Sequence, residues 1–189
     1  WRKMESKFDI ETIEKEINDF NANHSDMKKG FSLMPVTFGI SFTKTPMNQA
    51  RALVHIYTDG SVGVSTGAVE MGQGVNTKML QIAAQIFSIT PKRVKLESTN
   101  TTRVANTSPS AASSTADLNG KALEKACNAL MDRLKICAAD HFNVSSHDVA
   151  VKDGVVYTNE NQTDLTWDQL VMMAFLKRIC LTENGHYAT

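Results

Sequence analysis

Residues 53–65, LVHIYTDGSVGVS, place two apolar runs on either side of the dipeptide Asp59-Gly60. Asp-Gly is a favoured pair in the two-residue turn that joins antiparallel strands. The stretch therefore predicts a β-hairpin with strands at 53–57 and 62–65, and this hairpin is the start of a sheet.

Two more elements are predicted upstream of the hairpin. Residues 36–42 alternate between large apolar side chains and small or polar ones, which is the period of a half-buried strand. Pro35 and Gly39 place this strand at a sheet edge. Residues 9–21 carry apolar side chains at helical spacing after Asp9, a favoured N-cap residue, and predict an amphipathic helix.

Helices dominate the prediction downstream of the hairpin. One helix follows Gly74 and ends before Pro91, and a longer one carries an apolar stripe between Leu123 and Ala138. The remaining predicted elements are a strand at 94–97, a hairpin at 149–157 and a last helix at 165–176. This order predicts an α+β fold class with mixed sheets, β-hairpins and packed helices.

The composition excludes several classes of protein. Twenty basic and 20 acidic residues cancel, so the charge excess expected of a nucleic-acid or membrane-surface binder is missing. The sequence has neither a run of about 20 apolar residues nor a signal segment. Its three cysteines form no CxxC pair, which favours reduced thiols and argues against an iron–sulfur or structural zinc site in this segment. We expect a cytoplasmic protein.

Two loops are candidates for ligand binding because each precedes a predicted helix. Residues 71–74, MGQG, combine flexible glycines with the free N–H groups of a helix start, which suits a phosphate or a pterin. The alternative is an ordinary strand-to-helix turn. Residues 106–115, NTSPSAASST, combine small side chains with hydroxyls, and their alternative role is an N-capping loop. The first loop is not a Walker loop, because Gln73 and Gly74 stand where that motif needs Lys and Ser or Thr.

Other patterns carry less weight. Residues 63–67, GVSTG, match the nucleophile motif of α/β-hydrolases, but Ser65 lies inside a predicted strand and the next helix starts about ten residues later. A hydrolase is therefore rejected. The five histidines have no metal-ligand spacing, and His55 is interpreted as a sheet residue. Cys127 and Cys137 belong to the apolar stripe and are interpreted as core residues.

Several strings together resemble the molybdopterin-binding subunit of the xanthine dehydrogenase family, over about residues 30–189. They occur in the family's order: 34–43 (MPVTFGISFT), 52–61 (ALVHIYTDGS), 70–74 (EMGQG) with 76–78 (NTK), and 106–113 (NTSPSAAS) with 116–120 (ADLNG). The chain begins at Trp1 and is expected to be an internal piece of that subunit. Residues 1–29 would be a helical lead-in, and 30–189 part of the molybdenum cofactor-binding domain.

The resemblance implies which residues contact the cofactor. Gln73 would bond the pterin through its amide, and Gly72 and Gly74 would leave room for it, next to Met71. On the other side would lie Ala112, Ser113, Ser114 and Thr115, although Ser114 stands where many relatives have valine. The two groups should lie on the same side of the fold, each at a helix start.

The resemblance also implies the reaction. The full enzyme would hydroxylate purines, hypoxanthine or xanthine to urate, with a pyranopterin molybdenum cofactor, and pass electrons to iron–sulfur and FAD subunits or domains. The alternatives are a noncatalytic structural or interaction domain, or an oxidoreductase for aldehydes or other N-heterocycles. The family's Gly-Glu-Pro glutamate is absent from this sequence, so no catalytic residue and no metal ligand is assigned here. We expect the isolated chain to fold, to lack the cofactor and to be inactive. Its partners would be the rest of the molybdenum subunit and the purine, not nucleic acid or a membrane.

Overall fold

The computed structural model describes residues 2–189, which divide into a first unit that ends at Gly39 and a second unit, Ile40–Thr189. The first unit contains helices α1 (Arg2–Phe8) and α2 (Ile10–Asn23), and none of their residues is buried. The predicted helix is thus confirmed as α2. The predicted cap at Asp9 is wrong: the residue has φ of 48° and its side chain makes no capping hydrogen bond.

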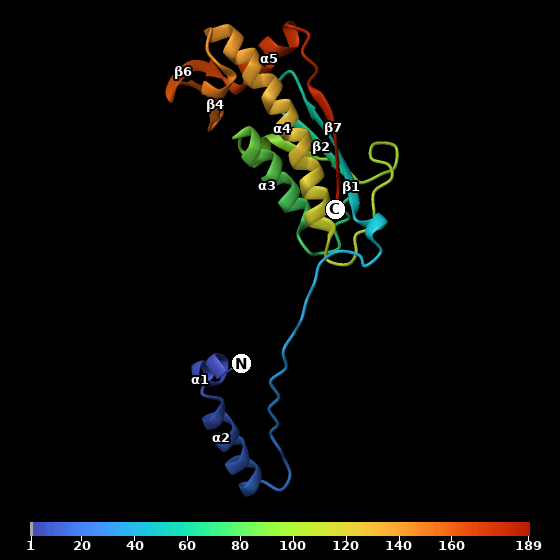
Figure 1. Ribbon diagram of the computed structural model, residues 1–189, viewed down its shortest axis with the longest axis vertical. Coiled ribbons are helices and arrows are strands. Elements are labelled where there is room, and N and C mark those ends of the chain that lie inside the picture. Colours follow the sequence, from blue (N-terminus) through green and yellow to red (C-terminus); the bar gives the residue numbers. More distant parts are fainter. Residues whose placement is uncertain (1) are drawn as a thin grey trace. The chain divides into compact units, whose positions relative to one another are not determined.

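A four-stranded sheet forms the centre of the second unit (Figure 1). Its strands, in spatial order, are β3 (Val94–Leu96), β2 (Val62–Thr66), β1 (Gln49–Ile56) and β7 (Thr182–Ala188). β1 pairs with β2 and β7 in antiparallel fashion, and β2 pairs with β3 in parallel. The hairpin at Asp59-Gly60 is confirmed as β1 and β2, in which Val54 pairs with Val64.

Two helices, α3 (Val75–Phe87) and α4 (Thr115–Phe142), lie next to each other over one face of this sheet (Figure 1). Both carry the predicted apolar stripes, which bury side chains such as Met79 and Leu123. α3 forms the crossover between the parallel strands β2 and β3. Helix burial against the sheet is the main source of stability of such a layer.

A smaller three-stranded antiparallel sheet follows α4. It consists of β4 (Val149–Lys152), β5 (Val155–Thr158) and β6 (Asn161–Thr166), and helix α5 (Trp167–Leu176) comes next. Trp167, the first residue of α5, connects this helix to the larger sheet. Its indole Nε1 donates to the Gly60 carbonyl in the β1–β2 turn at 2.8 Å, and its ring centroid lies 5.4 Å from that of Phe87 in α3. Three short 3₁₀ helices complete the elements: Thr45–Met47, Pro91–Arg93 and Ser146–Asp148.

The α+β class is confirmed, but one predicted strand is not formed. Residues 36–42 belong to no strand, and Val36 and Phe38 are 83% and 71% exposed. A period-two pattern specifies a strand only where another strand completes its hydrogen bonds, and the described residues provide none for this segment.

Candidate functional site

The loop before α3 is exposed throughout its length, from Val69 to Gly74. Gly72 and Gly74 have φ angles of 97° and 76°, and Gly74 is the N-cap of the helix. A Cβ at either glycine would meet no atom within 4 Å. Glycine is therefore needed here for backbone conformation, and the absent side chains leave the backbone open to a ligand.

Glu70 holds this loop in shape. One oxygen of its carboxylate accepts the N–H groups of Gly72 and Gly74 at 2.8 and 2.9 Å, and the other accepts the N–H of Asn76 at 3.0 Å. The backbone hydrogen bond from Asn76, followed by that from Gly74, lowers the pKa of Glu70 below its ordinary value. Glu70 was not among the site residues predicted from the sequence, although a carboxylate just ahead of a helix start is a recognisable signal.

The amide of Gln73 folds back onto the same loop. Its Oε1 accepts the N–H of Met71 at 2.6 Å, and its Nε2 donates to the carbonyl of Val69 at 2.8 Å. Both groups are exposed, so both hydrogen bonds are accessible for exchange with a ligand. Met71 itself is 67% exposed.

The loop before α4 is built differently. Ala112 and Ser113 are exposed and have φ angles of 52° and 53°, a left-handed conformation that is unfavourable for residues other than glycine. Ser114 and Thr115 are buried at the helix start. The Ser114 hydroxyl donates to the carbonyl of Ala111 at 3.0 Å, and no side chain caps the helix. The capping role considered for this loop is therefore wrong for Ser114.

The two loops are in direct contact. The backbone N–H of Val69 donates to the hydroxyl of Ser110 at 2.9 Å, and Gly67 packs against the side chain of Thr107. Both helices begin at the same end of the second unit (Figure 1). The prediction that the loops lie on one side, each at a helix start, is confirmed.

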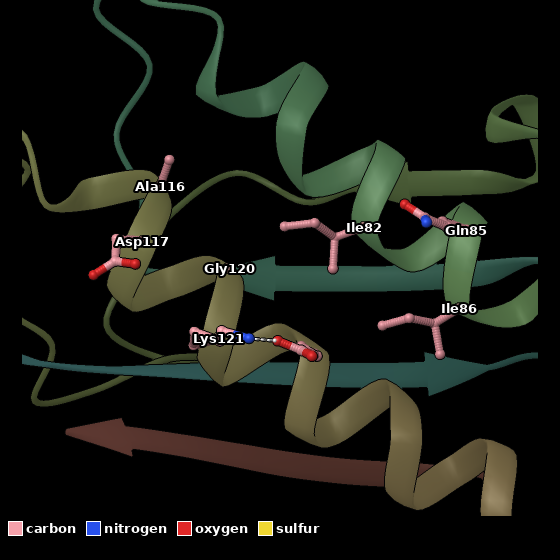
Figure 2. A pocket seen from close by; sticks show the side chains of 8 residues that line it. Ile82, Gln85, Ile86, Ala116, Asp117, Gly120 and Lys121 are labelled. Atoms are coloured by element: carbon pink, nitrogen blue, oxygen red, sulfur yellow. Dashed lines mark hydrogen bonds and ion pairs between the residues drawn. The ribbon is translucent and has the colours of Figure 1, made fainter. Parts of the chain in front are cut away.

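One hollow lies between the second half of α3 and the first turns of α4, and another lies beside the first loop. The first, of about 480 Å³, is lined by residues such as Ile82, Ile86, Asp117 and Gly120, and Figure 2 shows Ile82 and Ile86 of α3 pointing toward α4. A second hollow of about 480 Å³ lies by the first loop and is lined by Glu70 and Glu97, among others. The first-loop residues 71–74 and the second-loop residues 112–115 line neither hollow. Residues 71–74, Ala112 and Ser113 are exposed to solvent, whereas Ser114 and Thr115 are buried.

Other candidate residues have structural roles. Ser65 lies within β2 and α3 starts only at Val75, which confirms that no nucleophile turn exists. The ring of His55 is hydrogen bonded to the hydroxyl of Thr182 at 2.9 Å, as expected of a sheet residue. Cys127 and Cys137 are buried as predicted, and burial raises the pKa of Cys127 to about 12.

Neither a metal centre nor a membrane span is found in the part of the chain that the structure describes. Among residues 2–189, no three His, Cys, Asp or Glu side chains are grouped to hold a metal ion. No helix in this range is long and apolar enough to cross a bilayer. The site is therefore defined by its two loops.

Comparison with known proteins points to one group. Residues 3–189 match the model of the molybdopterin cofactor-binding domain. The chain is 39% identical over 173 residues to xanthine dehydrogenase of Dictyostelium discoideum, which is 92% of this chain and 11% of the relative. It is 35% identical over 189 residues to xanthine dehydrogenase/oxidase of Mus musculus, which is all of this chain and 13% of that protein. The chain thus spans about an eighth of these relatives or less.

Solved structures share the fold at low identity. Quinoline 2-oxidoreductase from Pseudomonas putida matches 74% of this chain and 19% of its own, with a TM-score of 0.67 and 22% identity. CO dehydrogenase from Oligotropha carboxidovorans matches 74% of this chain and 18% of its own, with a TM-score of 0.67 and 20% identity.

Proposed function

Because the chain belongs to the molybdopterin cofactor-binding domain family, we propose that its two adjacent helix-start loops form part of the wall that holds a pyranopterin molybdenum cofactor. The hydrogen bond from the Val69 N–H to the Ser110 hydroxyl carries the proposal, because it joins the loops into one surface. Residues 30–189 would be the cofactor-binding part and residues 1–29 a helical lead-in.

The exposed parts of both loops suit a flat, polar ligand. Gly72 and Gly74 leave the backbone uncovered, and Gln73 between them carries an amide that both donates and accepts. Met71 borders them on the same loop. Ala112 and Ser113 face outward on the second loop, with Ser114 and Thr115 behind them at the start of α4. A ligand that exchanges with the internal hydrogen bonds of Gln73 would gain one donor and one acceptor.

The residues of this chain would bind and orient the cofactor, and the bound group would supply the redox chemistry. Identity of 35–39% to xanthine dehydrogenases favours a purine substrate, with hypoxanthine or xanthine oxidised to urate in the cytoplasm. Since this chain covers only 11–13% of those proteins, the other walls of the site, the purine pocket and the iron–sulfur and FAD partners would come from the rest of the enzyme. No residue of this chain is assigned to proton transfer.

We predict that Gln73→Ala in the full-length enzyme lowers molybdenum content or purine oxidation about threefold to tenfold, since one hydrogen bond contributes about 0.5–1.5 kcal/mol. Stability should change by less than about 0.5 kcal/mol, because the side chain is exposed. Metal analysis and a purine oxidation assay measure the effect.

Gln81→Ala is the matched control, because Gln81 is an exposed amide on α3 itself. Equal molybdenum content and equal activity in Gln73→Ala, Gln81→Ala and the parent enzyme would remove the cofactor assignment from this loop.

A further inference from the structure

The start of α3 already holds an anion that belongs to the chain. A helix start attracts negative charge through its free N–H groups and its dipole. Here the carboxylate of Glu70 occupies that position and accepts three backbone N–H groups within five residues of sequence, those of Gly72, Gly74 and Asn76. The donors thus satisfied are not free for a phosphate.

We infer that Glu70 is the positioning residue of this loop: its carboxylate fixes the two left-handed glycines that flank Gln73 and thereby holds the backbone from which the Gln73 amide would reach the cofactor. The inference rests on the proposed function, since it assigns Glu70 a role that acts through Gln73. Glu70 itself is bonded to backbone only, and no step of the reaction is assigned to it.

The geometry shows why a fixing group is needed. Gly72 and Gly74 flank Gln73 directly, and glycine changes φ more freely than any other residue. Neither glycine has a neighbouring atom within 4 Å of the Cβ position to limit its motion. The only side chains that accept hydrogen bonds from residues 71–76 are those of Glu70 and Gln73, within the described hydrogen bonds. Without Glu70, the turn that carries Gln73 would lose three of its four side-chain acceptor bonds.

The charges around Glu70 support a backbone-directed role. The nearest carboxylate in the adjoining hollow is Glu97, which is paired with Lys95 at 2.9 Å and with Arg103 at 3.7 Å. Lys95 and Arg103 therefore form ion pairs with Glu97, and Glu70 has no ion pair among the described residues. Its fixed negative charge makes the start of α3 unfavourable for an anionic part of the cofactor, so this loop offers the neutral amide of Gln73 instead.

The first test uses the 189-residue chain and needs no cofactor. Hydrogen exchange by NMR is measured for the amides of Gly72, Gly74 and Asn76 in Glu70→Ala and Glu70→Gln, with Glu160→Gln as control. Glu160 is an exposed carboxylate in a hairpin turn. Exchange should accelerate about tenfold at these amides in Glu70→Ala and less in Glu70→Gln, which retains one acceptor, while α3 stays helical by circular dichroism. Unchanged exchange in both Glu70 variants would overturn the inference.

The second test uses the full-length enzyme and a double-mutant cycle. Glu70→Ala should lower molybdenum content about as much as Gln73→Ala, and the double variant should be no worse than Gln73→Ala, because the first residue acts through the second. Glu70→Gln should restore part of the loss. Additive losses would show that Glu70 acts independently and would overturn the inference. A loss in neither single variant would instead reject the proposed function, while the amide exchange still decides whether Glu70 fixes the loop.

Discussion

The loop before α3 turns at Gly72 and Gly74, whereas the loop before α4 turns at Ala112 and Ser113, and all four φ angles lie between 52° and 97°. The conformation costs glycine almost nothing, but it costs other residues roughly 1–2 kcal/mol each. The second loop is therefore strained and the first is not. Such strain persists only where surrounding structure stabilises it, and it is frequent at binding sites.

The two loops also differ in what holds them. Glu70 fixes the first loop from within through three hydrogen bonds. The second loop depends on its neighbours: the N–H of Ser41 donates to the carbonyl of Ala112 at 3.1 Å, and Ser110 accepts the N–H of Val69. One half of the site is therefore a preformed local turn, and the other half depends on tertiary contacts.

The largest effect is expected where the loops meet. Gly67→Val should cost about 1–3 kcal/mol, because an added Cβ would lie 2.7 Å from the Cβ of Thr107 and no space exists for a branched side chain. Urea unfolding measures the loss. Thr107→Gly in the same chain should recover most of it, and Gly30→Ala, with no atom near the added Cβ, should have little effect. If Gly67→Val were as stable as the parent chain, the second loop would not depend on this contact.

The elements that sequence predicted are those with local signals. The hairpin of β1 and β2 has its turn pair at Asp59-Gly60, and α4 has an apolar stripe that extends over many turns. β7 was missed because residues 182–188, TENGHYA, lack apolar alternation, and the strand forms only by pairing with β1 more than 120 residues earlier. The strand expected at 36–42 has a clear alternating pattern, but none of the strands in residues 2–189 pairs with it.

The candidate site was predictable to the same extent. Glycine is the residue type typical of positive φ angles, and both Gly72 and Gly74 have positive φ in the structure. Ala112 and Ser113 could not be recognised as left-handed, since nothing in those residue types favours that conformation and tertiary contacts impose it. Glu70 lies between these cases, because its residue type suits a helix start but its three partners depend on how the loop turns.

The next effect in size is expected at low pH, which should loosen the first loop but not the second. The pKa of Glu70 is lowered in the folded chain by the backbone N–H groups that it accepts, so its hydrogen bonds are fully present at neutral pH and are lost only as the pH falls through that lowered pKa, below the ordinary range of a glutamate. NMR shifts and exchange at Gly72 and Gly74 should change in this range, while those at Ala112 and Ser113 should not. Glu97 lines the same hollow as Glu70 and also has a lowered pKa. Glu70→Gln is therefore the control, and it must abolish the change. A change that persists in Glu70→Gln would assign the effect to Glu97.

The smallest effect is expected from exchanging the residue types of the two turns, and its sign is the informative part. Ala112→Gly removes roughly 1–2 kcal/mol of backbone strain but adds about 0.5–1 kcal/mol of conformational entropy cost, so it should stabilise the chain by about 0.5 kcal/mol. Gly72→Ala places an L residue at φ 97° in open space, where only the backbone is affected, and should destabilise by about 1 kcal/mol. Urea unfolding should therefore give changes of opposite sign in the free energy of unfolding for the two variants, although both exchange alanine and glycine. A stability loss in Ala112→Gly would mean that the methyl group of Ala112 makes contacts stronger than the strain it bears, and the contrast between a relaxed and a strained loop would then be lost.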